Sequence, residues 1–548
     1  LLLGRLFVLQ VNQADKWKAL AESQHTLSQS LRAERGEILL RDGDGMSPVA
    51  VNREYKLVYV VPKEIEDISR TALELSAVLS VDEQEIRGRL ETRREDPFEV
   101  VKKRVSEEEM ARLKELHLKG VYFLPEMYRY YPGAELASKV VGFVGPAEEG
   151  DVGVYGVESS FNNELHGKDG KLSQEKDAAG RWISLSDRDH VEAEDGQSVV
   201  LTIDRVVQYE VERILANALE KFGADQVSAI VMEPKTGKIL AMAALPQFNP
   251  NEYGKEEDLS RFMNPTVSLP YEPGSIMKPI TMAMGIEEGK VGPNTEFVDT
   301  GSVSEGGYTI RNAQDKVYGR SSMIKVLDES INTGAIFVER LIGNARFREY
   351  MERFGFGQRT GVRLPAENPG NLRNLFNPKA TLQFYTAAFG QGVTVTPLQI
   401  VNAYSTIANG GVLMQPQIVD RYIKSDGTIV PVESHEVRRV VSEETARTLG
   451  TMLRSVVQNG HGKRADVPGY AVVGKTGTAQ VAKQGSRGYE DSINIGSFAG
   501  YAPAKDPHYV VLVKVDNPKD VEWAESSAAP TFGAIMQFLL NYGKVQPT

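Results

Sequence analysis

The chain has 548 residues, more than one compact core usually holds, which predicts two or three domains. Its net charge of −11 argues against a nucleic-acid-binding protein, because such proteins usually carry a basic face. With no cysteine, the chain excludes disulfides, thiolate metal sites and a cysteine nucleophile, and no metal or other cofactor is expected.

The first eleven residues, LLLGRLFVLQV, are apolar except for Arg5 and Gln10. As a helix they would span roughly half of a ~30 Å hydrocarbon core. One interpretation is a buried core helix; the other is the second half of a membrane anchor. A polar, helix-favouring stretch follows up to Arg32. We therefore expect a truncated anchor and a juxtamembrane helix over residues 1–31.

Residues 32–195 are expected to form a separate, non-catalytic domain. A turn-rich hairpin is predicted within residues 36–60, and residues 61–119 are expected to be mostly helical and heavily charged. Residues 142–180 are rich in glycine and polar residues, as is typical of loops with short strands. The charged segment 187–197 has no apolar periodicity, and it is the best candidate for the domain boundary.

Residues 61–119 contain two pairs of residues typical of helix starts and one basic cluster. Ser80 with Glu83, and Ser106 with Glu109, match the capping box, in which each side chain satisfies the other residue's free backbone donor. The basic cluster 102–104 is flanked by acidic residues, which indicates a solvated helix face rather than a binding patch.

The pattern changes in residues 196–548, where strands and helices alternate with hairpins. This interleaving predicts an α/β (α+β) fold, with an antiparallel sheet and helices packed on its faces. The expected strands are 199–203, 227–232, 239–243, 470–480, 494–501 and 508–515, and the expected helices are 206–221, one from Thr396-Pro397 to Asn409, one from Ser442 to Asn459, and 530–540.

The first motif that could carry chemistry is Glu272-Pro-Gly-Ser275-Ile-Met-Lys278. A helix from Ser275 to about Glu288 would be apolar nearly all round and therefore buried. Ser275 and Lys278 are three residues apart, so both project from one side. The helix N-terminus would stabilise developing negative charge at Ser275. A desolvated Lys278 would favour its neutral form and could take the hydroxyl proton.

The Ser-x-x-Lys triplet alone is weak evidence, because it also occurs at Ser173/Lys176 and at Ser322/Lys325. At most one of the three copies can hold a nucleophile. Only the copy at Ser275 combines a preceding Pro-Gly turn with a buried helix, so we expect the other two to be solvated surface residues.

The second motif is Ser330-Ile331-Asn332. Residues two apart point to different sides of a helix, so Ser330 and Asn332 can face one cleft only from a loop or a helix end. A helix-capping serine is the simpler interpretation of this triplet taken alone.

The third motif is Gly474-Lys475-Thr476-Gly477-Thr478, at the end of the β-branched run 471–473. Glycine on a strand lets another backbone approach closely. Lys475 offers a positive charge, and the two threonines offer hydroxyls, so the group could hold a carboxylate. The triplet recurs at Lys235-Thr236-Gly237, in the predicted turn of the first hairpin, where its glycine serves turn geometry.

In this order, the three motifs resemble those of the penicillin-binding proteins and serine β-lactamases. Further segments are similar to the class B penicillin-binding proteins, which are monofunctional transpeptidases, and two lean toward the cell-division (septal) branch. Leu40 departs from the family pattern, which usually has an acid there. The segments that carry this resemblance are 35–38, 129–132, 153–158 and 195–204 for class B, and 272–275 and 390–399 for the septal branch.

The resemblance implies a penicillin-binding transpeptidase fold on residues 196–548 and an elongated, dimerisation-like pedestal domain on residues 32–195. It also implies a role for each motif residue. Ser275 would be the nucleophile on a D-Ala-D-Ala stem peptide, Lys278 its base, Ser330 a proton relay and Asn332 a holder of the substrate amide. Lys475, Thr476, Gly477 and Thr478 would bind the terminal carboxylate. Ser275 and Thr478 would supply the N–H groups of the oxyanion hole.

The implied activity is cross-linking of peptidoglycan stem peptides through a serine acyl-enzyme, and β-lactams would acylate the same serine. An elongation-type transpeptidase, a D,D-carboxypeptidase or β-lactamase-like hydrolase, and a non-enzymatic sensor or scaffold remain alternatives. The resemblance further implies a single-pass membrane anchor with a periplasmic catalytic domain. A polytopic glycosyltransferase and other division proteins would be its partners, and no nucleic acid would be bound.

Overall fold

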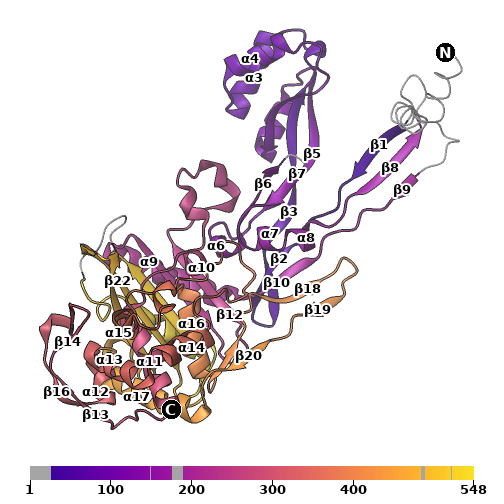
Figure 1. Cartoon of the computed structure of the whole chain (residues 1–548). Helices are drawn as coiled ribbons and strands as arrows, with labels where there is room; N and C mark the ends of the chain where they lie inside the picture. Colours follow the sequence, from indigo (N-terminus) through magenta and orange to yellow (C-terminus); the bar gives the residue numbers. More distant parts are fainter. Residues whose placement is uncertain (1–25, 148–149, 176–188, 483–487, 520, 548) are drawn as a thin grey trace, which may run out of the picture. The chain divides into compact units, whose positions relative to one another are not determined.

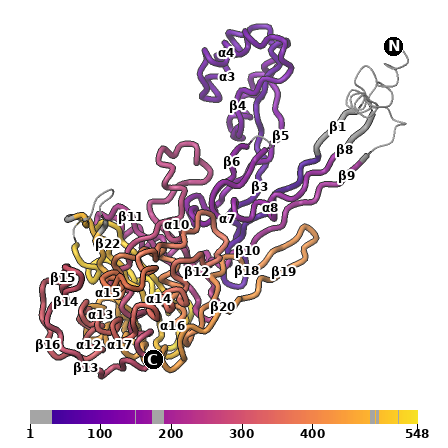
Figure 2. Tube along the Cα trace, in the orientation of Figure 1, coloured from indigo at the N-terminus to yellow at the C-terminus, as the bar shows by residue number. Residues whose placement is uncertain are grey.

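The computed structural model describes residues 26–147, 150–175, 189–482, 488–519 and 521–547. The chain divides into two compact units, one of residues 50–132 and a larger one that comprises the residues before 50 and after 132 (Figure 1). The backbone trace in Figure 2 follows the same path along the chain.

The smaller unit, residues 50–132, packs helices against a three-stranded antiparallel sheet. The strand order is β4-β3-β5, and apolar side chains of β3 and of the helices form its core. Its elements are β3 (Gly45–Val60), α3 (Ile68–Leu79), α4 (Glu83–Thr92), β4 (Glu99–Val105), α5 (Glu107–Glu115) and β5 (Val121–Tyr130).

Of the local predictions in this unit, one is confirmed and two are wrong. Ser106 and Glu109 form the capping box of α5. Ser80 instead ends α3 in the left-handed conformation, and Asp82 caps α4 because its carboxylate accepts a hydrogen bond from the Glu85 N–H. The basic cluster 102–104 lies on strand β4 rather than on a helix, because valines around the cluster favour pairing with β3.

The larger unit is built on a five-stranded antiparallel sheet with the order β12-β11-β23-β22-β21, which leaves β21 at an edge. The strands are β11 (Gln226–Met232), β12 (Ile239–Leu245), β21 (Val473–Ala482), β22 (Tyr489–Ala502) and β23 (Tyr509–Asp516). Helices α9 (Arg205–Phe222) and α18 (Ala528–Tyr542) pack on one face, and α16 (Pro397–Ala408) and α17 (Glu443–Gln458) pack on the other. The predicted antiparallel sheet with helices on its faces is confirmed.

A second layer beyond α17 carries most of the site. It contains the helices α11 (Lys278–Glu287), α12 (Met323–Asp328), α13 (Asn332–Ile342), α14 (Asn344–Arg353) and α15 (Thr381–Ala387), and the strand pairs β13 (Glu296–Asp299) with β16 (Gly319–Ser322) and β14 (Ser302–Glu305) with β15 (Tyr308–Arg311). Helix α11 packs against both α13 and α17, so it is enclosed on two sides. This explains why its sequence is apolar nearly all round.

Short strands and helices complete the larger unit. In one group of strands β10 (Ser198–Asp204) pairs in parallel with β2 (Ile38–Asp42) and antiparallel with β18 (Val419–Ile423). The remaining elements are β1 (Thr26–Leu31), α6 (Ser138–Val141), β6 (Val144–Ala147), β7 (Gly150–Gly153), α7 (Gly156–Ser160), α8 (Asn162–His166), β8 (Gly170–Glu175), β9 (Asp189–Val191), α10 (Pro265–Ser268), β17 (Val412–Met414), β19 (Ile429–Pro431) and β20 (Glu436–Arg439).

The predicted membrane anchor lies mostly in residues 1–25, outside the described residues. Thr26–Leu31, which were expected to continue a helix, form strand β1 and pair with β8. Their Thr and Ser residues are weak helix formers, and pairing with β8 satisfies the backbone groups instead. Among the helices of the described residues, none combines the length and the apolar character needed to cross a bilayer.

Candidate active site

Ser275 lies on a tight turn that leads directly into a buried helix. A 3-10 turn, η5 (Gly274–Met277), precedes α11. Gly274 has a φ of +59°, and a Cβ at this position would lie only 3.1 Å from the carbonyl oxygen of Thr478 on β21. The Gly274 N–H donates to the carbonyl of Gly390 at 3.0 Å. The turn is therefore held between β21 and the 390–392 segment.

Lys278 is the first residue of α11, and only 1% of it is exposed. Its Nζ donates hydrogen bonds to Oγ of Ser330, at 3.0 Å, and to the Ser330 carbonyl oxygen. Burial lowers the pKa of Lys278 well below its ordinary value, and the nearby charge of Lys475 lowers it further. The amine is therefore biased toward the neutral form that can accept a proton.

Ser330 and Asn332 stand at the junction between α12 and α13. Ser330 has a φ of +56°, and Asn332 is the first residue of α13. The Asn332 side chain donates from Nδ2 to the carbonyl of Arg311 at 2.9 Å. A helix end is the arrangement that the Ser-Ile-Asn spacing requires for both side chains to face one cleft.

The Lys-Thr-Gly motif lies on the edge strand β21. Lys475 is fully buried, and its Nζ donates to Oγ1 and to the carbonyl oxygen of Thr476, both at 3.2 Å. Burial lowers the pKa of Lys475 to about 7, although the charges of Asp328 and Glu525 act in the opposite direction. Near neutral pH Lys475 can therefore lose the positive charge that the motif was expected to offer to a carboxylate.

Gly477 is the point at which the turn before Ser275 approaches β21. A Cβ on Gly477 would lie 2.9 Å from the carbonyl oxygen of Pro273 and 3.0 Å from Cγ2 of Ile276. The prediction that glycine on this strand permits close approach of another backbone is confirmed at this residue.

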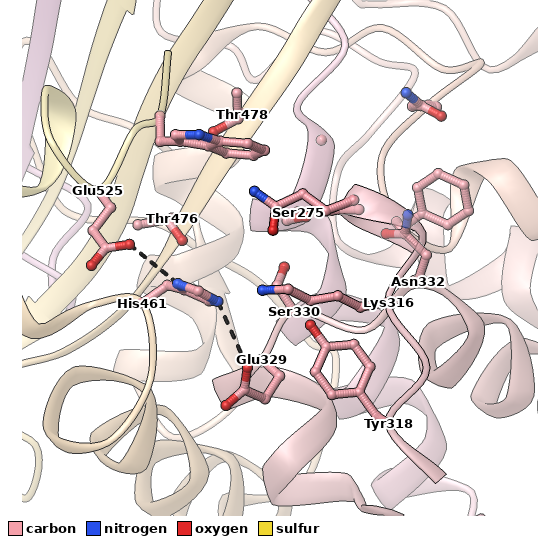
Figure 3. A pocket seen from close by; sticks show the side chains of 16 residues that line it. Ser275, Lys316, Tyr318, Glu329, Ser330, Asn332, His461, Thr476, Thr478 and Glu525 are labelled. Atoms are coloured by element: carbon pink, nitrogen blue, oxygen red, sulfur yellow. Dashed lines mark hydrogen bonds and ion pairs between the residues drawn. The ribbon is translucent and has the colours of Figure 1, made fainter. Parts of the chain in front are cut away.

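The motif residues meet around one cavity of about 320 Å³ (Figure 3). Ser275, Ser330, Asn332, Thr476 and Thr478 line it, and they come from three separate stretches of sequence. The two lysines lie buried behind this lining: Lys278 bonds to Ser330, and Lys475 bonds to Thr476. The structure therefore brings together all three motifs.

The described residues of the duplicate Lys-Thr-Gly and Ser-x-x-Lys triplets do not line the cavity. Lys235 is 64% exposed and pairs with Asp506, and Gly237, with a φ of +76°, shapes the turn between β11 and β12. Ser322 accepts a hydrogen bond from the Lys325 N–H and caps α12. In the third copy, Lys176 lies outside the described residues.

Several residues that no motif marks also line the cavity. His461 Nδ1 lies 3.2 Å from a carboxylate oxygen of Glu525, and its Nε2 lies 4.0 Å from one of Glu329 (Figure 3). Glu329 directly precedes Ser330, and this position beside a motif is a feature of the sequence that could have marked it as a cavity residue. Others in this group are Ala313, Gln314, Lys316, Tyr318, Phe389, Gln391 and Trp523.

Neighbouring segments hold η5 and α11 in place. The hydroxyl of Tyr404 on α16 donates to the carbonyl of Ile276 at 2.8 Å. Thr281 donates from Oγ1 to the carbonyl of Ala388 at 2.8 Å. The Glu272 carboxylate accepts a hydrogen bond from the Gly392 N–H at 3.0 Å. These contacts fix Ser275 from α16 and from the 388–392 segment.

Two long segments of the chain match known protein families. Residues 227–537 match the penicillin-binding protein transpeptidase domain, and residues 30–201 match the penicillin-binding protein dimerisation domain. Stage V sporulation protein D of Bacillus subtilis is 35% identical, over 99% of this chain and 83% of that protein. Peptidoglycan D,D-transpeptidase FtsI of Escherichia coli is 30% identical, over 100% of this chain and 90% of that protein.

The fold is similar to that of solved structures as well. The crystal structure of penicillin-binding protein 3 from Mycobacterium tuberculosis, complexed with aztreonam, superposes with a TM-score of 0.73 at 30% sequence identity. The match covers 95% of this chain and 98% of that one. The likeness therefore extends over both the smaller unit and the larger unit.

Proposed function

The chain belongs to the penicillin-binding protein transpeptidase family, and from that premise we propose that it cross-links peptidoglycan stem peptides through an acyl-enzyme on Ser275. It is a serine-type peptidoglycan D,D-transpeptidase that β-lactams acylate. The observation that carries the assignment of residues is the contact between Lys278 and Ser330 behind the cavity that Ser275 lines.

In the first step, neutral Lys278 takes the proton of the Ser275 hydroxyl while the oxygen attacks the carbonyl carbon of the penultimate D-alanine. The low pKa of Lys278 supports this role, because a general base works best when it is unprotonated at the working pH. Backbone N–H groups of Ser275 and Thr478 would stabilise the oxyanion, a contribution typically worth about 10²–10³ in rate per donor.

In the second step, the carbon–nitrogen bond of the peptide breaks and the terminal D-alanine leaves. The nitrogen of the leaving group needs a proton, and Ser330 can relay one from Lys278, since its hydroxyl lies 3.0 Å from Nζ. Asn332, held by the Arg311 carbonyl, would bind the amide of the substrate backbone.

The strand β21 would bind the donor peptide. Because β21 is an edge strand, an extended peptide can add to it through backbone hydrogen bonds. Thr476 and Thr478 line the cavity, and Lys475 is hydrogen-bonded to Thr476, so the three would hold the terminal carboxylate. Gly477 contributes through its missing side chain, which leaves room for the turn before Ser275.

In the last step, an amine of a second stem peptide attacks the acyl-enzyme, a new amide forms and Ser275 is released with its proton. A hydrolase would pass the acyl group to water instead. Incubation with a donor peptide and an amine acceptor separates the two, since transfer yields the cross-linked amide and hydrolysis yields the free acid. A product mixture without the amide would contradict the proposed transfer.

Labelling with a fluorescent penicillin tests the assignment of the nucleophile. The adduct, mapped by mass spectrometry, should lie on Ser275, and Ser275→Ala should abolish it. Ser322→Ala is the matched control, because Ser322 also begins a Ser-x-x-Lys triplet yet caps α12. A label on any other residue would overturn the assignment.

In the cell, we place this activity in septal wall synthesis, with residues 1–31 as membrane anchor and juxtamembrane segment, 32–195 as pedestal and 196–548 as periplasmic catalytic domain. Similarity to a cell-division and a sporulation protein supports the septal role. A polytopic glycosyltransferase would supply the glycan strands. Fluorescence of a tagged copy should gather at mid-cell, and an even distribution along the side wall would favour an elongation role.

A further inference from the structure

One wall of the cavity is formed by the segment between β15 and β16, which no motif predicts. Ala313, Gln314, Lys316 and Tyr318 of this segment all line the cavity. Gln314 and its neighbour Asp315 have φ values of +57° and +54°, a conformation that is unusual for residues other than glycine. Neighbouring contacts must therefore hold the segment in this shape.

Asp299, at the end of β13, supplies those contacts. One carboxylate oxygen accepts hydrogen bonds from the Tyr318 N–H, at 2.7 Å, and from the Asn312 side-chain amide, at 2.9 Å. The other accepts from the Thr333 hydroxyl, at 2.6 Å, and from the Gly301 N–H, at 2.9 Å. Asp299 thus ties both ends of the 312–318 segment to the start of α13.

The charge state of Asp299 agrees with this role. Burial alone would raise the pKa of Asp299, but the hydrogen bonds from Thr333, Tyr318, Gly301 and Asn312 outweigh burial and hold it below its ordinary value. The carboxylate remains ionised and keeps its four donors. Because Thr333 directly follows Asn332, the segment is fixed relative to the second catalytic motif.

Lys316 is the cation that this segment presents to the cavity. Figure 3 shows its side chain among those that line the cavity. Among the described residues, no carboxylate forms an ion pair with Lys316. The two glutamates of the cavity lining, Glu329 and Glu525, both face His461 instead.

Two further lysines lie close to the cavity, and both are hydrogen-bonded to residues of the motifs. Lys278 is buried and hydrogen-bonded to Ser330, and Lys475 is buried and hydrogen-bonded to Thr476. Neither belongs to the cavity lining. Lys316 is exposed, so its side chain is accessible to a bound ligand.

We propose that Lys316 is a specificity-determining residue that binds a second carboxylate of the ligand, distinct from the terminal carboxylate held at β21. The inference rests on the proposed function, because it assumes that a peptide or a β-lactam occupies this cavity. The second carboxylate would belong to the side chain of the donor or to the acceptor. An ammonium in the cavity lining would favour ligands that carry a second carboxylate over otherwise identical neutral ones.

A matched pair of β-lactams tests the donor side. Carbenicillin is benzylpenicillin with one additional carboxylate on the side chain, so the ratio of their second-order acylation rates isolates that charge. Lys316→Met should lower the ratio of carbenicillin to benzylpenicillin about threefold to fivefold, the range expected for a solvent-exposed ion pair. Lys316→Arg should keep the ratio. Lys290→Met, which removes an exposed lysine after α11, should leave the ratio unchanged.

The acceptor side is tested with a thioester donor and either D-alanine or D-alaninamide as the acceptor. A loss of preference for D-alanine in Lys316→Met would assign the second carboxylate to the acceptor, whereas a change in the penicillin ratio would assign it to the donor. If neither ratio changes while benzylpenicillin still acylates Ser275, the inference is overturned and the proposed function stands. If benzylpenicillin fails to acylate the wild-type enzyme, the proposed function itself falls, and the inference with it.

Discussion

Lys278 Nζ donates a hydrogen bond to Ser330 Oγ at 3.0 Å, which links the first catalytic motif to the second through a fully buried amine. The two residues are 52 positions apart in the sequence. In the proposed mechanism, their contact would give a proton removed from Ser275 a direct path toward the leaving group. The strength of this arrangement depends on desolvation, since the same burial that lowers the pKa of Lys278 also strengthens its hydrogen bonds.

Replacing Lys278 should therefore abolish most of the acylation. Lys278→Met keeps the length and apolar stem of the side chain but removes the base, and we expect the second-order rate of acylation by benzylpenicillin to fall at least ~10³-fold. Stopped-flow or gel-based labelling would measure it. Lys290→Met, at an exposed position after α11, should acylate at the wild-type rate. A fall of less than tenfold in Lys278→Met would show that another group is the base.

The rate of acylation should depend on pH through both buried lysines. It should rise with pH as Lys278 loses its proton, at a pH well below that of an ordinary lysine, because burial lowers the pKa of Lys278. Above neutrality it should fall, because burial lowers the pKa of Lys475 to about 7 and a neutral Lys475 no longer attracts the ligand carboxylate. The second-order rate constant for benzylpenicillin, measured from pH 5 to pH 9, should trace a bell.

Lys475→Arg separates the two limbs of this profile. The guanidinium stays charged over the whole range, so the fall above neutrality should disappear while the rise caused by Lys278 remains. Lys235→Arg, in the exposed duplicate of the motif, should leave both limbs in place. A flat profile in the wild-type enzyme would contradict the titration of either lysine.

The three motifs could be predicted from the sequence because each depends mainly on residues that are close to one another along the chain. The Pro-Gly turn, the apolar helix after Ser275 and the spacing of Ser330 and Asn332 each constrain a few neighbouring residues. Strand β21 was likewise recognisable from its β-branched residues. Helix α16 was bounded correctly by Thr396 and Asn409, because a capping Thr with Pro at the first turn marks its start and Gly410-Gly411 follows its end.

The rest of the cavity could not be predicted, because its residues reach the site through tertiary contacts. His461 and Glu525 lie in loops without periodicity, and they meet only because α17 ends near the segment after β23. The 312–318 segment is positioned by Asp299, whose donors come from four different places in the sequence. Strand β4 was mistaken for a helix because cross-strand pairing with β3 outweighs the propensity of its lysines.

Glu339 on α13 should limit the stability of the enzyme at neutral pH. Its side chain is fully buried, and among the described residues neither carboxylate oxygen has a hydrogen-bond partner. Burial raises the pKa of Glu339 to about 7, so between pH 4.5 and 7 the folded protein holds a proton that the unfolded chain has lost. The free energy of unfolding should therefore fall across this interval, by up to about 3 kcal/mol.

Glu339→Gln removes this titration. We expect it to be nearly neutral at pH 5 and to raise the free energy of unfolding at pH 8, as measured by urea denaturation at both values. Glu257→Gln, at an exposed position before η4 (Leu259–Phe262), should leave the free energy of unfolding unchanged at both pH values. An equal effect of Glu339→Gln at both pH values would mean that the carboxyl group does not titrate in this range.

Gly477 should tolerate no side chain, because the turn that carries Ser275 lies against it. In Gly477→Ala the new Cβ would lie 2.8 Å from Oγ of Ser497, 2.9 Å from the carbonyl oxygen of Pro273 and 3.0 Å from Cγ2 of Ile276. Ser497 can rotate, but the Pro273 backbone must move, and with it Ser275. We expect acylation by benzylpenicillin to fall more than tenfold, since small displacements of a nucleophile are costly.

Overpacking should also lower the free energy of unfolding, by about 1–3 kcal/mol. Gly254→Ala, where a Cβ would meet open space, is the matched control and should retain both properties. Wild-type acylation in Gly477→Ala would show that the turn can shift without disturbing the nucleophile.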